Sequence, residues 1–119
     1  MIISKNEQLV EVRSNLAGGV GEITLTHFLD KENSFGTGRV FAVFTLQPGS
    51  SIGYHKHEGE FEVYYMLEGT AEVMDDGEIY QLQTGDMMQC NPGGSHSIIN
   101  KSEDPVRFLA FYWKSQSNF

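Results

Sequence analysis

The sequence has little that would cross-link the chain or carry it into a membrane. Its 119 residues include one cysteine, which excludes an intrachain disulfide and fits a reducing compartment. No apolar run approaches the ~20 residues that a membrane-spanning helix needs. The first six residues, MIISKN, lack the basic and then apolar order of a secretory signal. We therefore expect a cytoplasmic protein that does not bind membranes.

Positive charge is also scarce. Eight Lys and Arg stand against sixteen Asp and Glu, so the formal net charge is −8, which disfavours nucleic acid as a partner. Between His57 and Asn100 there are nine acidic residues and no Lys or Arg. A cation in that region would come from a bound metal ion, or from Arg39, Lys56 or Arg107 in flanking strands.

Helical periodicity is absent, so we expect helix for a turn or two at most. Short segments rich in β-branched and aromatic residues alternate instead with turn signals. This pattern predicts one all-β domain over residues 1–119, a closed barrel or double-sheet jelly roll of about ten strands. Besides the strand that carries His55, the predicted strands cover residues 8–13, 22–29, 40–46, 61–67, 70–74, 79–82, 87–90, 96–99 and 106–113.

Three histidines and a glutamate give the strongest functional signal. His55 and His57 are separated by one residue, so in a β-strand their side chains point to the same face. Glu62 and His96, arriving from neighbouring strands, would complete a site of three nitrogens and one oxygen. Such a donor set suits a divalent transition metal and suits calcium or magnesium poorly, because those ions prefer oxygen ligands.

The spacing of these residues resembles the two motifs of the cupin superfamily. The first, G-x(5)-H-x-H-x(3,4)-E-x(6)-G, corresponds to residues 49–69, and the second, G-x(5)-P-x-G-x(2)-H-x(3)-N, to residues 85–100. One position departs from the second motif, because Asn91 stands where the motif has proline. Pro92 follows it and would stiffen the same turn.

The resemblance implies a small single-domain cupin, which is a double-stranded β-helix or jelly-roll barrel. It also implies that His55, His57, Glu62 and His96 hold one divalent metal ion: iron, manganese, nickel, cobalt or zinc. An open coordination position at such an ion would accept water or a small, anionic ligand.

The sequence offers fewer candidates for a catalytic acid or base than for metal ligands. Strand alternation places Tyr64 and Met66 on the face of Glu62, and Ile98 and Asn100 on the face of His96, so we expect these residues in the pocket wall. Tyr64 would donate a hydrogen bond to a metal-bound ligand, or else be an ordinary core tyrosine.

Three further residues are weaker candidates. Glu60 shares the facing of Glu62, although its spacing falls short of the motif, and it is the second candidate for catalysis. His27 lies outside both motifs, where a lone histidine is usually structural. Cys90 belongs to an apolar strand with no Lys or Arg near it in sequence to lower its thiol pKa, but it would face the cavity if its strand turned that way.

The resemblance leaves the reaction open, because cupins include dioxygenases, oxalate-type decarboxylases, sugar isomerases and proteins that only bind ligands. Our leading hypothesis is an oxidoreductase of the dioxygenase kind, or a decarboxylase, that acts on a small carboxylate or enediol-type substrate. The alternatives are a non-catalytic, metal-dependent binder of a small anion or sugar, and a metal-dependent isomerase. An isomerase would need Tyr64, Glu60 or His27 as its base.

Apolar side chains exceed what one small barrel is expected to cover. They alternate along residues 61–67 and crowd the last predicted strand, so we expect a homodimer. The residues proposed for its interface are Val63, Tyr65, Leu67, Phe108, Phe111, Tyr112 and Trp113.

Overall fold

The computed structural model describes residues 1–30 and 32–115, with the backbone alone described at residues 38 and 39. Ten strands form within this part of the chain, and each predicted strand begins and ends within two residues of an observed one. The strands are β1 (Leu9–Ser14), β2 (Glu22–Leu29), β3 (Gly38–Leu46), β4 (Ser51–Lys56), β5 (Glu60–Glu68), β6 (Ala71–Asp75), β7 (Glu78–Leu82), β8 (Met87–Cys90), β9 (Ser95–Ile99) and β10 (Val106–Lys114). The all-β prediction is confirmed.

Helix is limited to two short 3₁₀ turns among the described residues, η1 (Lys5–Glu7) and η2 (Leu16–Gly18). No helix in the described part of the chain has the length and apolar character to cross a bilayer.

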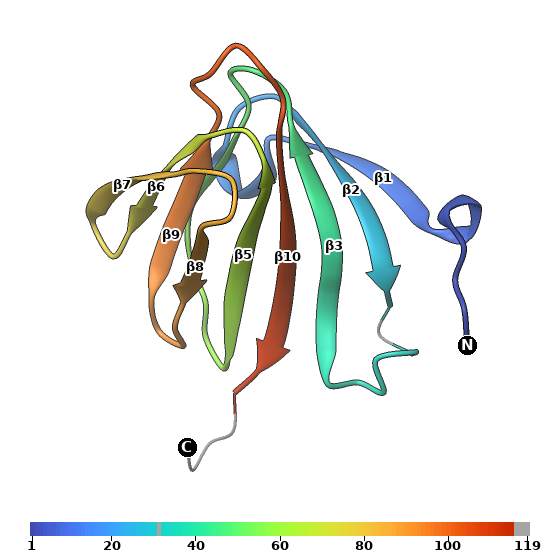
Figure 1. Cartoon of the computed structure of the whole chain (residues 1–119). Coiled ribbons are helices and arrows are strands. Elements are labelled where there is room, and N and C mark those ends of the chain that lie inside the picture. The colour runs from blue at the N-terminus through green and yellow to red at the C-terminus, as the bar shows by residue number, and fades with distance from the viewer. Residues whose placement is uncertain (31, 116–119) are drawn as a thin grey trace.

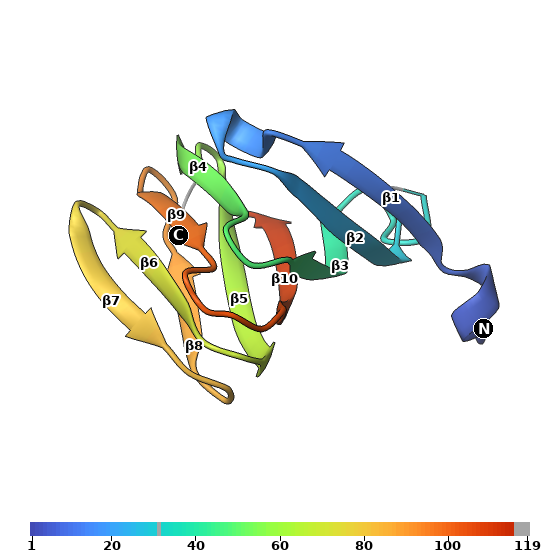
Figure 2. The ribbon, with the colours of Figure 1, turned by 90° about the horizontal axis from the view of Figure 1, so that it is seen from above.

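The strands form two antiparallel sheets that face each other as the layers of a jelly-roll barrel (Figures 1 and 2). The larger sheet has the order β1-β2-β3-β10-β5-β8, and the smaller has the order β4-β9-β6-β7. Seen from above, β1 and β2 extend the larger sheet beyond the smaller one (Figure 2). The metal-ligand candidates therefore come from both layers, with β4 and β9 on one side and β5 on the other.

Strand alternation sorts the side chains between the core and the outside. On β10, Val106, Phe108, Ala110 and Tyr112 are buried between the sheets, whereas Arg107, Leu109, Phe111 and Trp113 are at least partly exposed. Each large apolar side chain buried in this way contributes roughly 1.5–3 kcal/mol to folding. Two residues proposed for a dimer interface, Phe108 and Tyr112, are thus core residues, and that part of the prediction is wrong.

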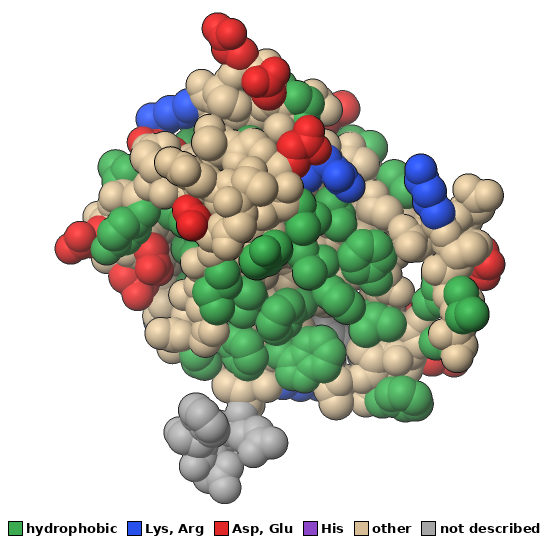
Figure 3. All heavy atoms as spheres, in the orientation of Figure 1, with side chains coloured by type: hydrophobic (Ala, Val, Ile, Leu, Met, Phe, Trp, Pro, Cys, Tyr) green, Lys and Arg blue, Asp and Glu red, His purple; other side chains and the backbone are tan. Residues whose placement is uncertain are grey.

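The outer side of the larger sheet remains rich in apolar side chains. Figure 3 shows them gathered over β5, β10 and β3. We call this set the outer apolar face and define it as Phe41, Val43, Phe61, Val63, Tyr65, Leu109, Phe111 and Trp113, with Met87 beside Tyr65. Tyr65 and Leu67 are exposed on the outer side of β5, as expected, whereas Val63 on the same side is buried.

Candidate metal centre

The four predicted ligand side chains meet at one point. The Nε2 atoms of His55, His57 and His96 are each 3.1 Å from the other two. Glu62 Oε1 lies 2.7 Å from Nε2 of His96, 2.9 Å from Nε2 of His57 and 3.8 Å from Nε2 of His55. All four donor atoms fall within 4.8 Å of one another, so this cluster is able to bind a metal ion.

Strand pairing and one turn bring the histidines together. His55 in β4 is directly opposite His96 in β9 across an antiparallel pair. His57 lies just beyond β4, and its backbone N–H donates to the carbonyl of Gly94 while its carbonyl accepts from the N–H of Gly93. The glycine turn of the second sequence motif therefore holds His57 beside His96.

The protonation of two imidazoles can be assigned from their outer nitrogens. Nδ1 of His55 is 2.7 Å from the carbonyl oxygen of Gly53, which can only accept a hydrogen bond. Nδ1 of His57 is 3.4 Å from a carboxylate oxygen of Glu60. Protons on these two Nδ1 atoms leave lone pairs on the Nε2 atoms that face the cluster when the rings are neutral.

The four donor atoms are arranged to bind a metal ion rather than to form hydrogen bonds with one another. Lone pairs of His55 and His57 face each other at 3.1 Å and need a shared cation between them. Donor atoms about 2.0–2.2 Å from one ion are separated by roughly 3 Å, which matches the observed spacing. The oxygen of Glu62 supplies the negative charge that a divalent ion requires.

Glu62 is ionised at neutral pH despite its burial. Burial alone would raise the pKa of its carboxyl group, but the contacts of its oxygen with His55, His57 and His96 outweigh that effect and lower the pKa to about 2. Its second oxygen, Oε2, is buried and has no hydrogen-bond partner among the described residues.

Tyr64 lies beneath the cluster. Its ring stacks on His96 with centroids 5.0 Å apart, and its hydroxyl is buried without a partner among the described residues. Burial, together with the negative charge of Glu62, raises the pKa of this phenol well above its usual value. Tyr64 therefore keeps its proton at neutral pH.

A cavity of about 200 Å³ opens on the other side of the cluster. The side chain of His55 is 21% exposed, whereas those of Glu62 and His96 are fully buried, so a ligand would arrive past His55 and His57. The cavity is lined by apolar residues, two cluster histidines and a few polar side chains: Arg13, Leu16, Ala17, Leu25, Val40, Phe44, Ile52, His55, Lys56, His57, Glu60 and Tyr112.

The expected wall is partly wrong. Tyr64, Met66 and Ile98 face inward as predicted, but they belong to the apolar core and do not line this cavity. Asn100 is also buried, and its side-chain amide donates to the carbonyl oxygens of Leu46 and Asp104, which is a structural role. Glu60, in contrast, lines the cavity and contacts His57.

The cations near the site differ from those expected. Lys56 lines the cavity, but Arg107 is on the outer side of β10 and pairs with Glu68 at 3.8 Å. The side chain of Arg39 lies outside the described residues. Arg13 lines the cavity and was not predicted, because nothing in the sequence signals that β1 reaches the mouth.

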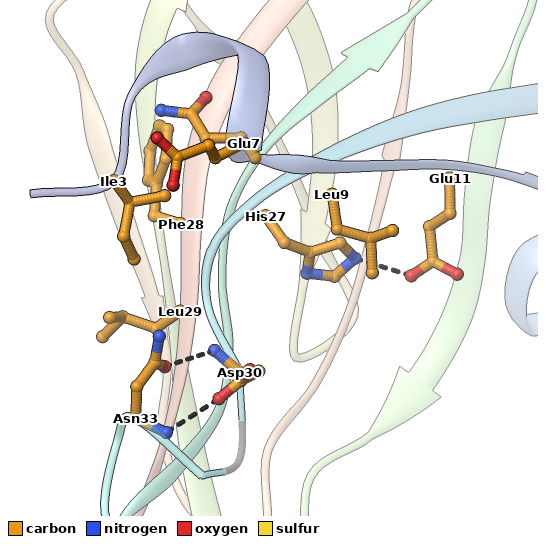
Figure 4. A pocket seen from close by; sticks show the side chains of 10 residues that line it. Ile3, Glu7, Leu9, Glu11, His27, Phe28, Leu29, Asp30 and Asn33 are labelled. Carbon is orange, nitrogen blue, oxygen red and sulfur yellow. Dashed lines mark hydrogen bonds and ion pairs between the residues drawn. The ribbon is translucent and has the colours of Figure 1, made fainter.

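His27 does not join the cluster. Its Nε2 lies 2.6 Å from Oε1 of Glu11, beside a separate hollow of about 270 Å³ at the β1–β2 edge (Figure 4). Glu11 also accepts a hydrogen bond from Arg13, and these two contacts lower the pKa of its carboxyl group below the usual value.

Cys90 is buried and faces the interior beside Glu62, its partner across the β5–β8 pair. Burial, helped by nearby carboxylates, raises the pKa of its thiol to about 11. Cys90 is thus a thiol at neutral pH and lies outside the set of residues that line the cavity.

Comparison with known proteins agrees with this architecture. Residues 42–112 match the family described as Cupin domain. A protein of Thermotoga maritima named oxalate-binding protein is 43% identical over 110 residues, which cover 92% of this chain and 91% of that protein.

Two solved structures are similar as well. A crystal structure described as a predicted oxalate decarboxylase from Thermotoga maritima has a TM-score of 0.91 and 41% identity, covering 97% of this chain and 100% of that one. A cupin protein from Bacteroides fragilis has a TM-score of 0.66 and 28% identity, covering 78% of each chain.

Proposed function

The chain belongs to the cupin domain family, and from this premise we propose that it binds one divalent transition metal ion and uses that ion to bind a small carboxylate of the oxalate type. The observation that carries the proposal is the convergence of three Nε2 atoms and one carboxylate oxygen beside a cavity that two of the histidines, His55 and His57, line. The bound ion would act there as a Lewis acid.

Charge supports a carboxylate ligand. A divalent ion with three neutral imidazoles and the Glu62 carboxylate has a net charge of +1, which attracts a monoanion or a chelating dicarboxylate. Most of the lining beside the cluster is apolar, and the carboxylate of Glu60 there would repel another anion. Burying an unpaired carboxylate in such a place costs several kcal/mol. A small anion is therefore expected to dock on the metal.

The surrounding residues would each have a defined role in that state. Gly53 and Glu60 hold the outer nitrogens of His55 and His57, so both rings keep their Nε2 atoms toward the metal. Tyr64 excludes water beneath His96. Leu25, Val40, Phe44 and Ile52 would exclude water from the side of the cavity that they line.

Decarboxylation is a second candidate function. Loss of carbon dioxide from a carboxylate leaves a carbanion that must take a proton. Glu60 lines the cavity and is not a member of the ligand cluster, so its carboxyl group is placed to carry that proton. The dioxygenase activity considered from the sequence is a third prediction, and consumption of dissolved oxygen during turnover tests it.

Metal content and calorimetry test the proposal. We expect one metal ion per chain, an occupancy at least tenfold lower in His57→Ala and His96→Ala, and an unchanged occupancy in His27→Ala. Oxalate should bind the metal-loaded protein and not the chelator-treated protein. Equal oxalate affinity of both forms would show that the metal is not the docking point.

A further inference from the structure

We propose that the ligand of this centre is longer than oxalate: a dicarboxylate whose one end chelates the metal and whose other carboxylate is bound by Arg13 at the mouth of the cavity. The inference rests on the proposed function, because it takes the metal as the docking point for the first carboxylate. It adds a specificity-determining residue and a ligand class to that site.

The size of the cavity supports a longer ligand. Its volume of about 200 Å³ corresponds to roughly seven waters at about 30 Å³ each. Oxalate is the shortest dicarboxylate, and a molecule held by both ends at the metal would fill only the floor. Drug-sized ligands need about 300–1,000 Å³, so nucleotides and other large cofactors are too big.

The wall between the metal and the mouth is suited to an alkyl chain. It is formed by Leu25, Val40, Phe44 and Ile52, all of them at most 7% exposed. These side chains offer no hydrogen bond to a carboxylate. They would pack on methylene groups, each of which adds about fourfold to affinity when it is buried.

Arg13 is the cation best placed to bind the far carboxylate. One guanidinium nitrogen is 2.9 Å from Glu11 Oε1, and the fork has further N–H donors that would bind a ligand. Glu11 is itself held by His27, as Figure 4 shows, and it is not among the residues that line the cavity.

Lys56 is the rival and is less suitable. It follows His55 and precedes His57, so strand alternation turns its side chain away from the metal-facing side of β4. Lys56 does line the cavity, but its ammonium group is 3.2 Å from the exposed carboxylate of Glu58, which is not a lining residue.

The segment that carries Arg13 is fixed relative to the metal. The turn that follows β1 bonds to β4, because the N–H of Ser51 donates to the carbonyl of Val20 and the N–H of Val20 donates to Ser51 Oγ, both at 2.9 Å. His55 is in the same strand as Ser51. The backbone that follows Arg13 is thus tied to the strand that carries His55, although β1 is an edge strand.

The experiment is a calorimetric titration of metal-loaded protein with three probes. Oxalate tests docking at the metal, 2-oxopentanoate adds an alkyl chain, and 2-oxoglutarate adds a second carboxylate to a chain of the same length. We expect 2-oxopentanoate to bind more tightly than oxalate, and 2-oxoglutarate to bind about fivefold more tightly still, the order of a solvent-screened ion pair.

Variants test whether Arg13 causes the gain in affinity from 2-oxopentanoate to 2-oxoglutarate. Arg13→Gln should abolish the preference for 2-oxoglutarate over 2-oxopentanoate, Arg13→Lys should restore part of it, and Arg107→Gln on the outer side of β10 should leave it unchanged. Loss of the preference in Lys56→Gln but not in Arg13→Gln would overturn the assignment. A preference for oxalate over both longer probes would overturn the ligand class.

The titration separates the failure of this inference from the failure of the proposed function. If oxalate binds only the metal-loaded protein and the longer probes gain nothing, the inference is wrong and the proposed function holds. If no probe distinguishes metal-loaded from metal-free protein, both are wrong.

Discussion

The Nδ1 atom of His55 lies 2.7 Å from the carbonyl oxygen of Gly53, two residues earlier in the same strand. This hydrogen bond sets the ring so that Nε2 faces the cluster. Gly53 is also the point where β4 meets the turn that contains η2, and a Cβ placed there would overlap the carbonyl oxygen of Ala17. Gly53 therefore does two things. Its carbonyl orients the His55 ring, and its lack of a side chain lets the η2 turn, which lines the cavity, pack against β4.

Gly53→Ala should therefore weaken metal binding as well as the fold. The added methyl group would push the η2 turn away or shift β4, and a shift of β4 misplaces His55. We expect the metal affinity to fall at least tenfold, measured by competition with a chromogenic chelator. Gly77→Ala is the control: Gly77 has a φ of 87° and open space around it, so that change should cost stability through backbone strain and leave metal affinity unchanged.

Glu60→Gln should weaken metal binding by a different route. The amide introduced by this change would still accept a hydrogen bond from Nδ1 of His57 but would carry no negative charge, so the imidazole would become a weaker ligand. We expect a loss of metal affinity of about tenfold. Glu58→Gln, two residues away and paired with Lys56, is the matched control and should change nothing. Equal affinities in both variants would remove Glu60 from the set of positioning residues.

The sequence predicted the cluster because side chains alternate between the two faces of a β-strand. The spacing of the cluster residues along the chain therefore shows which of them share a face. His55 and His57, and the turn that holds His57 beside His96, are readable as local patterns. Arg13 was missed for the opposite reason. Its place at the mouth depends on the contact between the turn after β1 and β4, far apart in sequence, and no periodicity encodes that contact.

The prediction of the pocket wall was partly wrong for a related reason. Alternation correctly placed Tyr64 on the inner side of β5, but a barrel interior has a lower part, filled by packed side chains, and an upper part that is open. The phase of a strand does not tell which part a residue occupies. Only the stacking of Tyr64 on His96 decides it.

Metal removal should leave the protein folded. The apolar core between the sheets is continuous without the cluster residues, so binding should add only the linkage free energy, about 2.7 kcal/mol when free metal is a hundred times its dissociation constant. Thermal melting with and without a chelator measures this difference. Unfolding at room temperature on adding the chelator would show that the metal is structural.

Cys90 should react slowly with thiol reagents in the folded protein. Its pKa of about 11 lies above the ordinary value of 9.0, so at pH 8 the folded state holds about a hundredfold less thiolate than the unfolded chain. Because folding favours the protonated thiol, this contribution to stability is complete below pH 9 and is lost as the pH rises toward 11. The rate of alkylation at pH 8, with and without denaturant, checks the shift. Similar rates in both conditions would mean that Cys90 is accessible and unperturbed.

The outer apolar face should pair with a second copy of the chain. Its aromatic rings already contact one another in a row, with centroids 6.4 Å apart between Phe41 and Phe111 and 6.3 Å apart between Phe61 and Phe111. Tyr65 and Met87 extend this surface and are 44% and 54% exposed, which leaves an apolar area that water covers poorly in one chain.

Light scattering at micromolar concentration should therefore give twice the mass of one chain. A charge placed on the outer apolar face would have to be desolvated in the dimer, so Tyr65→Glu should shift the equilibrium to the monomer. The matched control is Tyr80→Glu, because Tyr80 is 51% exposed on β7 in the other sheet and should leave the dimer intact. A wild-type protein that scatters as a monomer would refute the pairing, and a dimer lost in Tyr80→Glu but not in Tyr65→Glu would move the interface to the smaller sheet.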